Sequence, residues 1–89
     1  MTVRIFVLGF VRGVGFRRFI KKNAVLLGLR GYVKNTPDGR VEILAQGSMK
    51  KIEELKKIAE KGNMFSDVKS VVVEIEEKQK DYSSFELRF

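Results

Sequence analysis

The sequence predicts an α+β sandwich in which two helices cover one face of an antiparallel sheet. Three observations support this fold class. Segments 16–27 and 49–61 repeat apolar residues at the spacing of amphipathic helices. Five other segments alternate apolar and polar residues, or are apolar throughout, as strands are. The order along the chain is β-α-β-β-α-β, followed by a short terminal strand.

The first strand is expected at 3–10 and the first helix at 16–27. The strand becomes apolar on both faces toward its end, which is typical of a central strand. Gly28 follows the helical pattern and is a good C-terminal stop. The apolar stripe of this helix is formed by Phe16, Phe19, Ile20, Ala24 and Leu27.

A hairpin is expected next, with strands at 31–35 and 40–46 on either side of Thr36-Pro37-Asp38-Gly39. These four residues are a strong turn signal. On the second of these strands, alternation places Glu42, Leu44 and Gln46 on the face away from the helices.

Ser48 is a suitable N-cap for the second helix, and Gly62 ends it. The buried stripe predicted for this helix consists of Met49, Ile52, Leu55 and Ala59.

A loop at 63–67 leads to a strand at 71–75, and the last strand is expected at 85–89. Right-handed crossovers favour the strand order 4-1-3-2, which is the ferredoxin-like arrangement. The first strand is then central, and the loop at its end lies beside the end of the second strand. The whole chain, 1–89, is expected to form one domain.

The composition excludes several chemistries. The chain has no cysteine and no histidine, which removes disulfides, thiol nucleophiles, zinc–thiolate sites and every histidine-based mechanism. The net charge of +7 suits anionic ligands. No apolar run approaches the ~20 residues of a membrane span, and the first residues already alternate as a strand. We expect a cytoplasmic protein with no membrane partner.

Gly13 and Gly15 lie between the first strand and the first helix. Two glycines in three residues let the backbone turn sharply and direct N–H groups at one point, where the helix N-terminus adds partial positive charge. Arg17 adds a planar guanidinium suited to phosphate or carboxylate. A plain packing turn is the alternative. However, Arg17 and Arg18 oppose the helix dipole in the first turn, which favours an anion at this end.

Asn35 stands at the end of the second strand, just before the turn. An amide both donates and accepts hydrogen bonds, so it can hold a water in line with a bound phosphorus. The alternative is that Asn35 caps backbone groups of the turn.

Several segments together resemble the acylphosphatase family. Residues 9–17, GFVRGVGFR, look like its signature loop, and residues 24–35 resemble its second signature. Asp38-Gly39, Val41-Glu42 and Gly47 continue the match, and residues 82–89 are similar to its closing strand. The similarity spans nearly the whole chain and is weakest at 63–67.

The resemblance implies hydrolysis of acyl phosphates to a carboxylate and inorganic phosphate, by a monomer that needs no metal or other cofactor. Arg17 matches the family's phosphate-binding arginine, and Asn35 matches its water-positioning asparagine. The backbone loop that holds the phosphate would consist of Arg12, Gly13, Val14, Gly15 and Phe16. The expected partner is a small acyl phosphate and not a nucleic acid.

Two residues depart from the family pattern. Arg12 stands where glutamine is usual, and a second cation there either tightens phosphate binding or blocks it. Tyr32 replaces a common tryptophan. Neither change removes a catalytic position.

Three other functions remain open. Residues 12–19 superficially resemble the RNP1 motif of RNA-recognition domains, but that motif belongs on the third strand. A phosphate sensor without turnover would keep the loop and Arg17. Carbamoyl phosphate processing occurs in larger proteins that carry an acylphosphatase-like domain.

Overall fold

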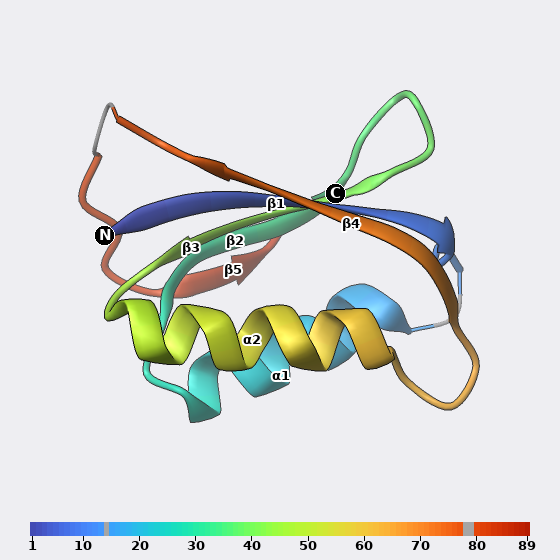
Figure 1. The fold of residues 1–89 in the computed structure, drawn as a ribbon, viewed down its shortest axis with the longest axis horizontal. Coiled ribbons are helices and arrows are strands. Elements are labelled where there is room, and N and C mark those ends of the chain that lie inside the picture. Colours follow the sequence, from blue (N-terminus) through green and yellow to red (C-terminus); the bar gives the residue numbers. More distant parts are fainter. Residues whose placement is uncertain (14, 78–79) are drawn as a thin grey trace.

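Two helices lie side by side on one face of a five-stranded sheet (Figure 1). The computed structural model describes residues 1–13, 15–77 and 80–89. The order of elements confirms the predicted α+β, ferredoxin-like fold. The elements are β1 (Thr2–Phe10), α1 (Phe16–Leu26), β2 (Arg30–Asn35), β3 (Val41–Gln46), α2 (Met49–Lys61), β4 (Asp67–Ile75) and β5 (Phe85–Leu87).

The strand order is β4-β1-β3-β2-β5, which confirms the predicted order of the first four strands and the central place of β1. The first four strands pair antiparallel, as predicted, and the terminal strand differs. Strand β5 pairs with the outer side of β2 in the parallel direction, so the sheet is mixed. Residues 31–33 of β2 pair there with residues 85–87.

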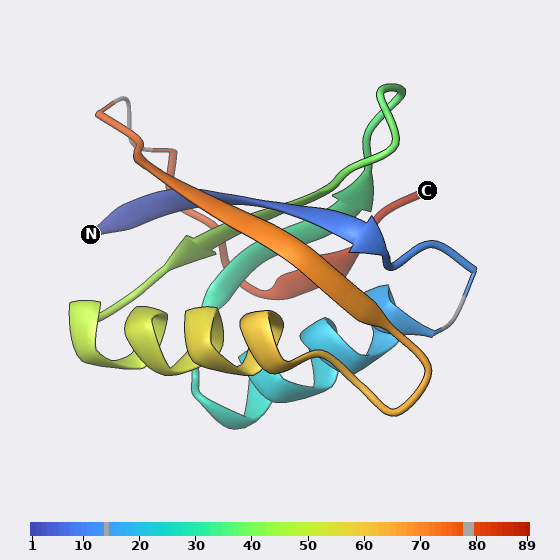
Figure 2. The same cartoon turned by 45° about the vertical axis from the view of Figure 1, so that its right-hand side comes forward.

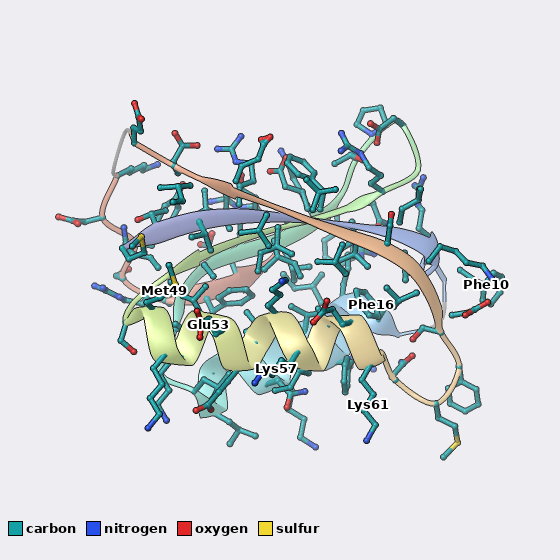
Figure 3. The ribbon with its side chains drawn as sticks, viewed as in Figure 1. Phe10, Phe16, Met49, Glu53, Lys57 and Lys61 are labelled. Carbon is teal, nitrogen blue, oxygen red and sulfur yellow. The ribbon has the colours of Figure 1, made fainter. Side chains whose placement is uncertain are left out.

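The core lies between the sheet and the two helices. The inward residues of β1 pair with inward residues of β3 on one side and of β4 on the other. Helix α1 contributes Phe16, which lies between helix and sheet in Figure 3 and is 1% exposed. The other buried helix residues are Ile20, Ala24, Ile52, Leu55 and Ala59.

Met49, predicted to be buried, is instead 38% exposed. It is the first residue of α2 and lies at the edge of the helical layer (Figure 3). The sheet therefore covers less of Met49 than of the residues farther along the stripe. Ser48 caps the helix as predicted, since its side chain accepts a hydrogen bond from the Lys51 backbone N–H at 3.3 Å.

Two strands differ from the prediction by more than one residue. Strand β4 begins at Asp67 and not at residue 71, because a register shift between Leu8 and Gly9 lets the pairing with β1 continue. The extension contains polar Lys69 and Ser70, which an edge strand tolerates because they remain exposed. Strand β5 ends at Leu87, two residues earlier than predicted.

The sheet face away from the helices is partly covered by the segment that leads into β5. Gln46 donates a hydrogen bond to the Lys80 carbonyl at 2.8 Å and accepts one from the Tyr82 backbone N–H at 3.0 Å. Glu42 on the same face is only 8% exposed and accepts a hydrogen bond from the Tyr32 hydroxyl at 2.6 Å. Gln46 therefore holds the last part of the chain against the sheet, and Glu42 links β3 to β2 on the same face.

Gly31 marks a close approach between β2 and β3. A Cβ at this position would lie 1.8 Å from the Leu44 carbonyl oxygen. We expect Gly31→Ala to lower the free energy of unfolding by about 3 kcal/mol, because backbone must move to relieve the overlap. Gly28→Ala is the matched control, since a Cβ there meets nothing within 4 Å. Denaturant unfolding of both variants checks this, and equal losses would contradict it.

Burial, followed by the hydrogen bond to Glu42, raises the pKa of Tyr32 from 10.0 to about 12. The chain has two tyrosines, so Tyr82→Phe leaves Tyr32 as the only source of phenolate absorbance. We expect its titration midpoint near pH 12, and a downward shift in Glu42→Gln because the carboxylate charge is gone. A midpoint near 10.0 with Glu42 intact would contradict the expected burial.

The same titration makes stability depend on pH. An unfolded chain loses the tyrosine proton near pH 10.0, whereas the folded chain keeps it until about 12. This contribution to stability is therefore fully present below pH 10.0 and is lost as the pH rises through 12. Tyr32→Phe should lose less stability than the wild type across this window, as measured by denaturant unfolding at each pH.

Candidate active site

Three parts of the chain, the first of which includes two neighbouring element ends, converge at one end of the molecule. They are the end of β1 with the start of α1, the end of β2 and the stretch after β5 (Figure 2). An open pocket of about 330 Å³, the Asn35 pocket, lies among them. Its lining residues are Arg12, Arg17, Asn35, Thr36, Pro37 and Phe89. The structure thus brings together three residues that the sequence singled out.

A second pocket of about 250 Å³, the Leu87 pocket, shares Arg17 and Phe89 with the first. Its lining residues are Val11, Gly13, Gly15, Phe16, Arg17, Arg18, Leu87 and Phe89. The predicted loop therefore reaches both pockets, with Arg12 in one and Gly13, Gly15 and Phe16 in the other. Val14, the remaining predicted member, lies outside the described residues.

Gly15 shapes the start of α1. Its backbone has φ 74° and ψ 15°, a left-handed conformation that favours glycine. The residue is the N-cap of the helix but offers no side-chain acceptor, and the first turn contains no acidic residue. The first intrahelical bond runs from the Phe19 N–H to the Gly15 carbonyl at 3.0 Å. The helix N-terminus consequently presents N–H donors without a side-chain cap among the residues that the structure describes, which suits an anion.

The stretch after β5 orients Arg17. The half-buried guanidinium donates a hydrogen bond through Nη1 to the Arg88 carbonyl at 2.6 Å and lies 4.9 Å from the centre of the Phe89 ring. Arg88 is fixed in turn, since its N–H donates to the Val33 carbonyl at 2.8 Å and its guanidinium lies 4.2 Å from the Tyr32 ring centre. Sequence reasoning missed Arg88 and Phe89 because no spacing indicated that this stretch returns to α1.

Asn35 is the last residue of β2, where its backbone pairs with Val41. Its Oδ1 atom is buried and accepts no hydrogen bond from any described residue. Thr36 bridges the turn instead, since its hydroxyl bonds to both the N–H and the carbonyl of Arg40 at 3.1 Å. Among the described residues, the Asn35 amide makes no turn-capping hydrogen bond, so it is available to a ligand or water in its pocket.

Positive charge is uncompensated at this end. Arg12, Arg17 and Arg18 form no ion pair with a carboxylate of the described chain, and no carboxylate side chain lines either pocket. Each pocket is lined by two arginines, and Arg17 is common to both. Two guanidinium groups beside a helix N-terminus favour a multiply charged anion such as a phosphate.

The nearby carboxylates are already engaged elsewhere. Hydrogen bonds from Arg40, followed by one from Thr36, lower the pKa of Asp38 to about 2. Glu42 is bound by the Tyr32 hydroxyl on the far face of the sheet. Within residues 1–13, 15–77 and 80–89, no three acidic side chains gather as a metal site would require.

The arrangement differs from an RNA-recognition sheet. The described part of the RNP1-like run, 12–19, lies in the loop and the first turn of α1. Phe16, which such a motif would place on an open sheet face, is 1% exposed beneath the helix.

Along the described chain, no helix is long and apolar enough to cross a membrane.

Comparisons of the sequence and of the structure with known proteins point to the same family. The acylphosphatase family model matches residues 3–87. The chain is 47% identical to the acylphosphatase of Caldivirga maquilingensis, over 100% of this chain and 95% of that protein. The crystal structure of the Bacillus subtilis acylphosphatase superposes with a TM-score of 0.94 at 36% identity, covering 99% of this chain and 98% of that one.

A larger protein also contains a similar fold. The crystal structure of full-length HypF in its phosphate- and nucleotide-bound form matches 99% of this chain with a TM-score of 0.84 and 28% identity, but only 12% of the HypF chain is covered. A family match over most of the sequence, with relatives at these identities, assigns the protein to one group of enzymes: the chain belongs to the acylphosphatase family.

Proposed function

We propose that the enzyme hydrolyses acyl phosphates at the junction of the Asn35 and Leu87 pockets. Water attacks phosphorus, the bond between phosphorus and the bridging oxygen breaks, and that oxygen leaves with its electron pair as part of a carboxylate. The overall reaction is RCO–OPO₃²⁻ + H₂O → RCOO⁻ + H₂PO₄⁻. The observation that carries this proposal is the meeting of Arg17 and Asn35 in one pocket beside an uncapped helix N-terminus.

Arg17 and the backbone of the 12–16 loop would hold the phosphoryl group. The guanidinium is already oriented by the Arg88 carbonyl, which leaves its other N–H groups for the ligand. The exposed guanidinium of Arg12 opens onto the same pocket and would add a second positive charge. Fixed donors of this kind stabilise the charge that spreads over the equatorial oxygens in the transition state.

Asn35 would position the attacking water. Its buried carbonyl oxygen can accept a hydrogen bond from water, so that the water's lone pair points at phosphorus. Phosphoryl transfer of this kind depends mainly on positioning and charge stabilisation. The leaving carboxylate is a weak base and needs little help from an acid, which fits a chain without histidine or cysteine.

Removing Arg17 should abolish most of the activity. We expect Arg17→Ala to lower kcat for an aryl acyl phosphate by about 1,000-fold, because one fixed transition-state donor is lost. Arg17→Lys should recover little, since an ammonium lacks the planar fork. Phosphate release in the presence of EDTA measures this, and circular dichroism confirms the fold.

Arg30→Ala is the matched control, because Arg30 is exposed at the start of β2 and lines neither pocket. Its activity should equal that of the wild type. Wild-type activity in Arg17→Ala would contradict the assigned role. A wild type that binds inorganic phosphate without hydrolysing any acyl phosphate would instead indicate a phosphate-binding module.

Removing the Asn35 amide should affect the reaction more than the binding. We expect Asn35→Ala to lower kcat by about 100-fold, with little change in the inhibition constant of inorganic phosphate. Asn23→Ala is the control, because that amide bonds to the Phe19 carbonyl within α1 at 2.8 Å. Steady-state kinetics with phosphate as inhibitor separates the two effects. A loss confined to phosphate affinity would argue against water positioning.

A further inference from the structure

Strand β4 forms a free edge of the sheet, since it pairs with β1 on one side and with no described strand on the other. In Figure 1, β4 and α2 lie nearest the viewer, at the opposite edge of the sheet from β5. We propose that two copies of the chain associate through this edge, with their β4 strands pairing antiparallel in one continuous sheet. This association goes beyond the proposed function and does not depend on it.

Strand β4 lacks the features that usually protect an edge strand. It is nine residues long and contains no proline. Its pairing irregularity lies near the N-terminal end, so residues 70–75 pair with β1 in a regular register. Lys69, its one lysine, lies outside this regular part and forms an ion pair with Asp67 at 2.8 Å. Residues 70–75 therefore present backbone N–H and C=O groups that a second strand can pair with.

Apolar side chains are exposed along the same edge. Val72 is 53% exposed, Val73 40% and Ile75 65%. Met49 of α2 joins Val73 and Ile75 in lining a groove of about 390 Å³ between α2 and the sheet, the α2 groove. This apolar strip is not buried within one chain, and a partner that covers it removes apolar surface from water.

The residues of β4 alternate between the two faces of the sheet. Those that pair with buried residues of β1 face the helices; they are Val71, Val73 and Ile75. Ser70, Val72 and Glu74 face the other way. A two-fold axis normal to the sheet keeps the helices of both copies on one face. Such an axis therefore places each β4 residue opposite a residue of the same face.

One register of this two-fold pairing joins compatible residues throughout. With the axis at Val72, that residue lies opposite its own copy, and Val71 lies opposite Val73 on both sides of the axis. Ser70 then lies opposite Glu74, so a hydroxyl donor meets a carboxylate acceptor. An axis at Val71 or at Val73 would instead place Val72 opposite a polar residue, Ser70 or Glu74. The sequence of β4 therefore favours its own copy in the register centred on Val72.

The rim of the α2 groove also suits a second copy. Its charged residues are Glu53, Lys56, Lys57 and Glu60, and Glu53 and Lys57 follow Met49 along α2 in Figure 3. Within the described chain, none of the four forms an ion pair. The two-fold axis brings a second α2 to the same seam in the opposite direction, with the same balance of charges. A rim of mixed sign meets its own copy without net repulsion, whereas a partner of one sign would not match it.

Sedimentation velocity at protein concentrations up to about 1 mM tests the association. The resemblance to the family implies a monomer, whereas we expect a reversible mixture of monomer and dimer. Val72→Lys places two lysines opposite each other and should weaken the dimer by about tenfold. Val25→Lys is the matched control, because Val25 is 55% exposed on α1, which packs against β2 and β5 at the other edge. It should leave the dimer unchanged.

Two further variants test the register without altering an apolar residue. Ser70 is exposed and would lie opposite Glu74 at two places in the dimer. Ser70→Lys should strengthen the dimer and Ser70→Glu should weaken it, each by about fivefold, because the new charge acts at both places. The net charge of +7 alone predicts the opposite order, since an added lysine increases the repulsion between copies.

Four results would overturn the association as described. They are a wild type that is monomeric at about 1 mM, species larger than a dimer, equal weakening by Val72→Lys and Val25→Lys, and equal effects of Ser70→Lys and Ser70→Glu. The hydrolysis of acyl phosphates is measured separately on the same proteins. Val72→Lys should keep the wild-type kcat, because no residue of β4 lines the Asn35 or the Leu87 pocket. An active monomer would overturn the association alone, and an inactive dimer would overturn the proposed function alone.

Discussion

The pairing of β1 with β3 on one side and β4 on the other determines where the rest of the molecule lies. Its inward residues, Val3, Ile5 and Val7, are at most 1% exposed and form the centre of the core. Because β1 is an interior strand, the loop that follows it begins near the middle of one end of the sheet, where the strands end. Strand β2, which lies beyond β3, ends at the same end of the sheet and brings Asn35 into the pocket that Arg12 and Arg17 also line.

The sequence predicts the elements and half of the site from local chemistry. Apolar spacing indicates both helices, and two glycines followed by an arginine at a helix start indicate an anion site. The pairing of Arg17 with Asn35 follows from the strand order, which handedness constrains. Local pattern carries little information at Met49, because the burial of this residue depends on how far the sheet extends.

The other half of the site could not be predicted, because it depends on long-range contacts. Strand β5 is three residues long and pairs parallel to β2, so no turn signal connects the two strands. On the far face of the sheet, Gln46 bonds to the segment before β5, and the Tyr32 ring contacts Tyr82 and Arg88. Alternation alone describes Gln46 and Tyr32 as outward-facing residues. Arg88 and Phe89 contact Arg17 on α1, and although they lie in the segment that resembles the family's closing strand, no local pattern there indicates this contact.

The partner that orients Arg17 is a main-chain carbonyl and not an acidic side chain. A carboxylate would also have fixed the guanidinium, but it would have cancelled its charge, and each arriving phosphate would have had to displace it. A carbonyl fixes the direction of the guanidinium and leaves its full positive charge available to the phosphoryl group that Arg17 is proposed to bind. Because a carbonyl does not titrate, the direction of the guanidinium does not depend on the protonation of an acidic partner.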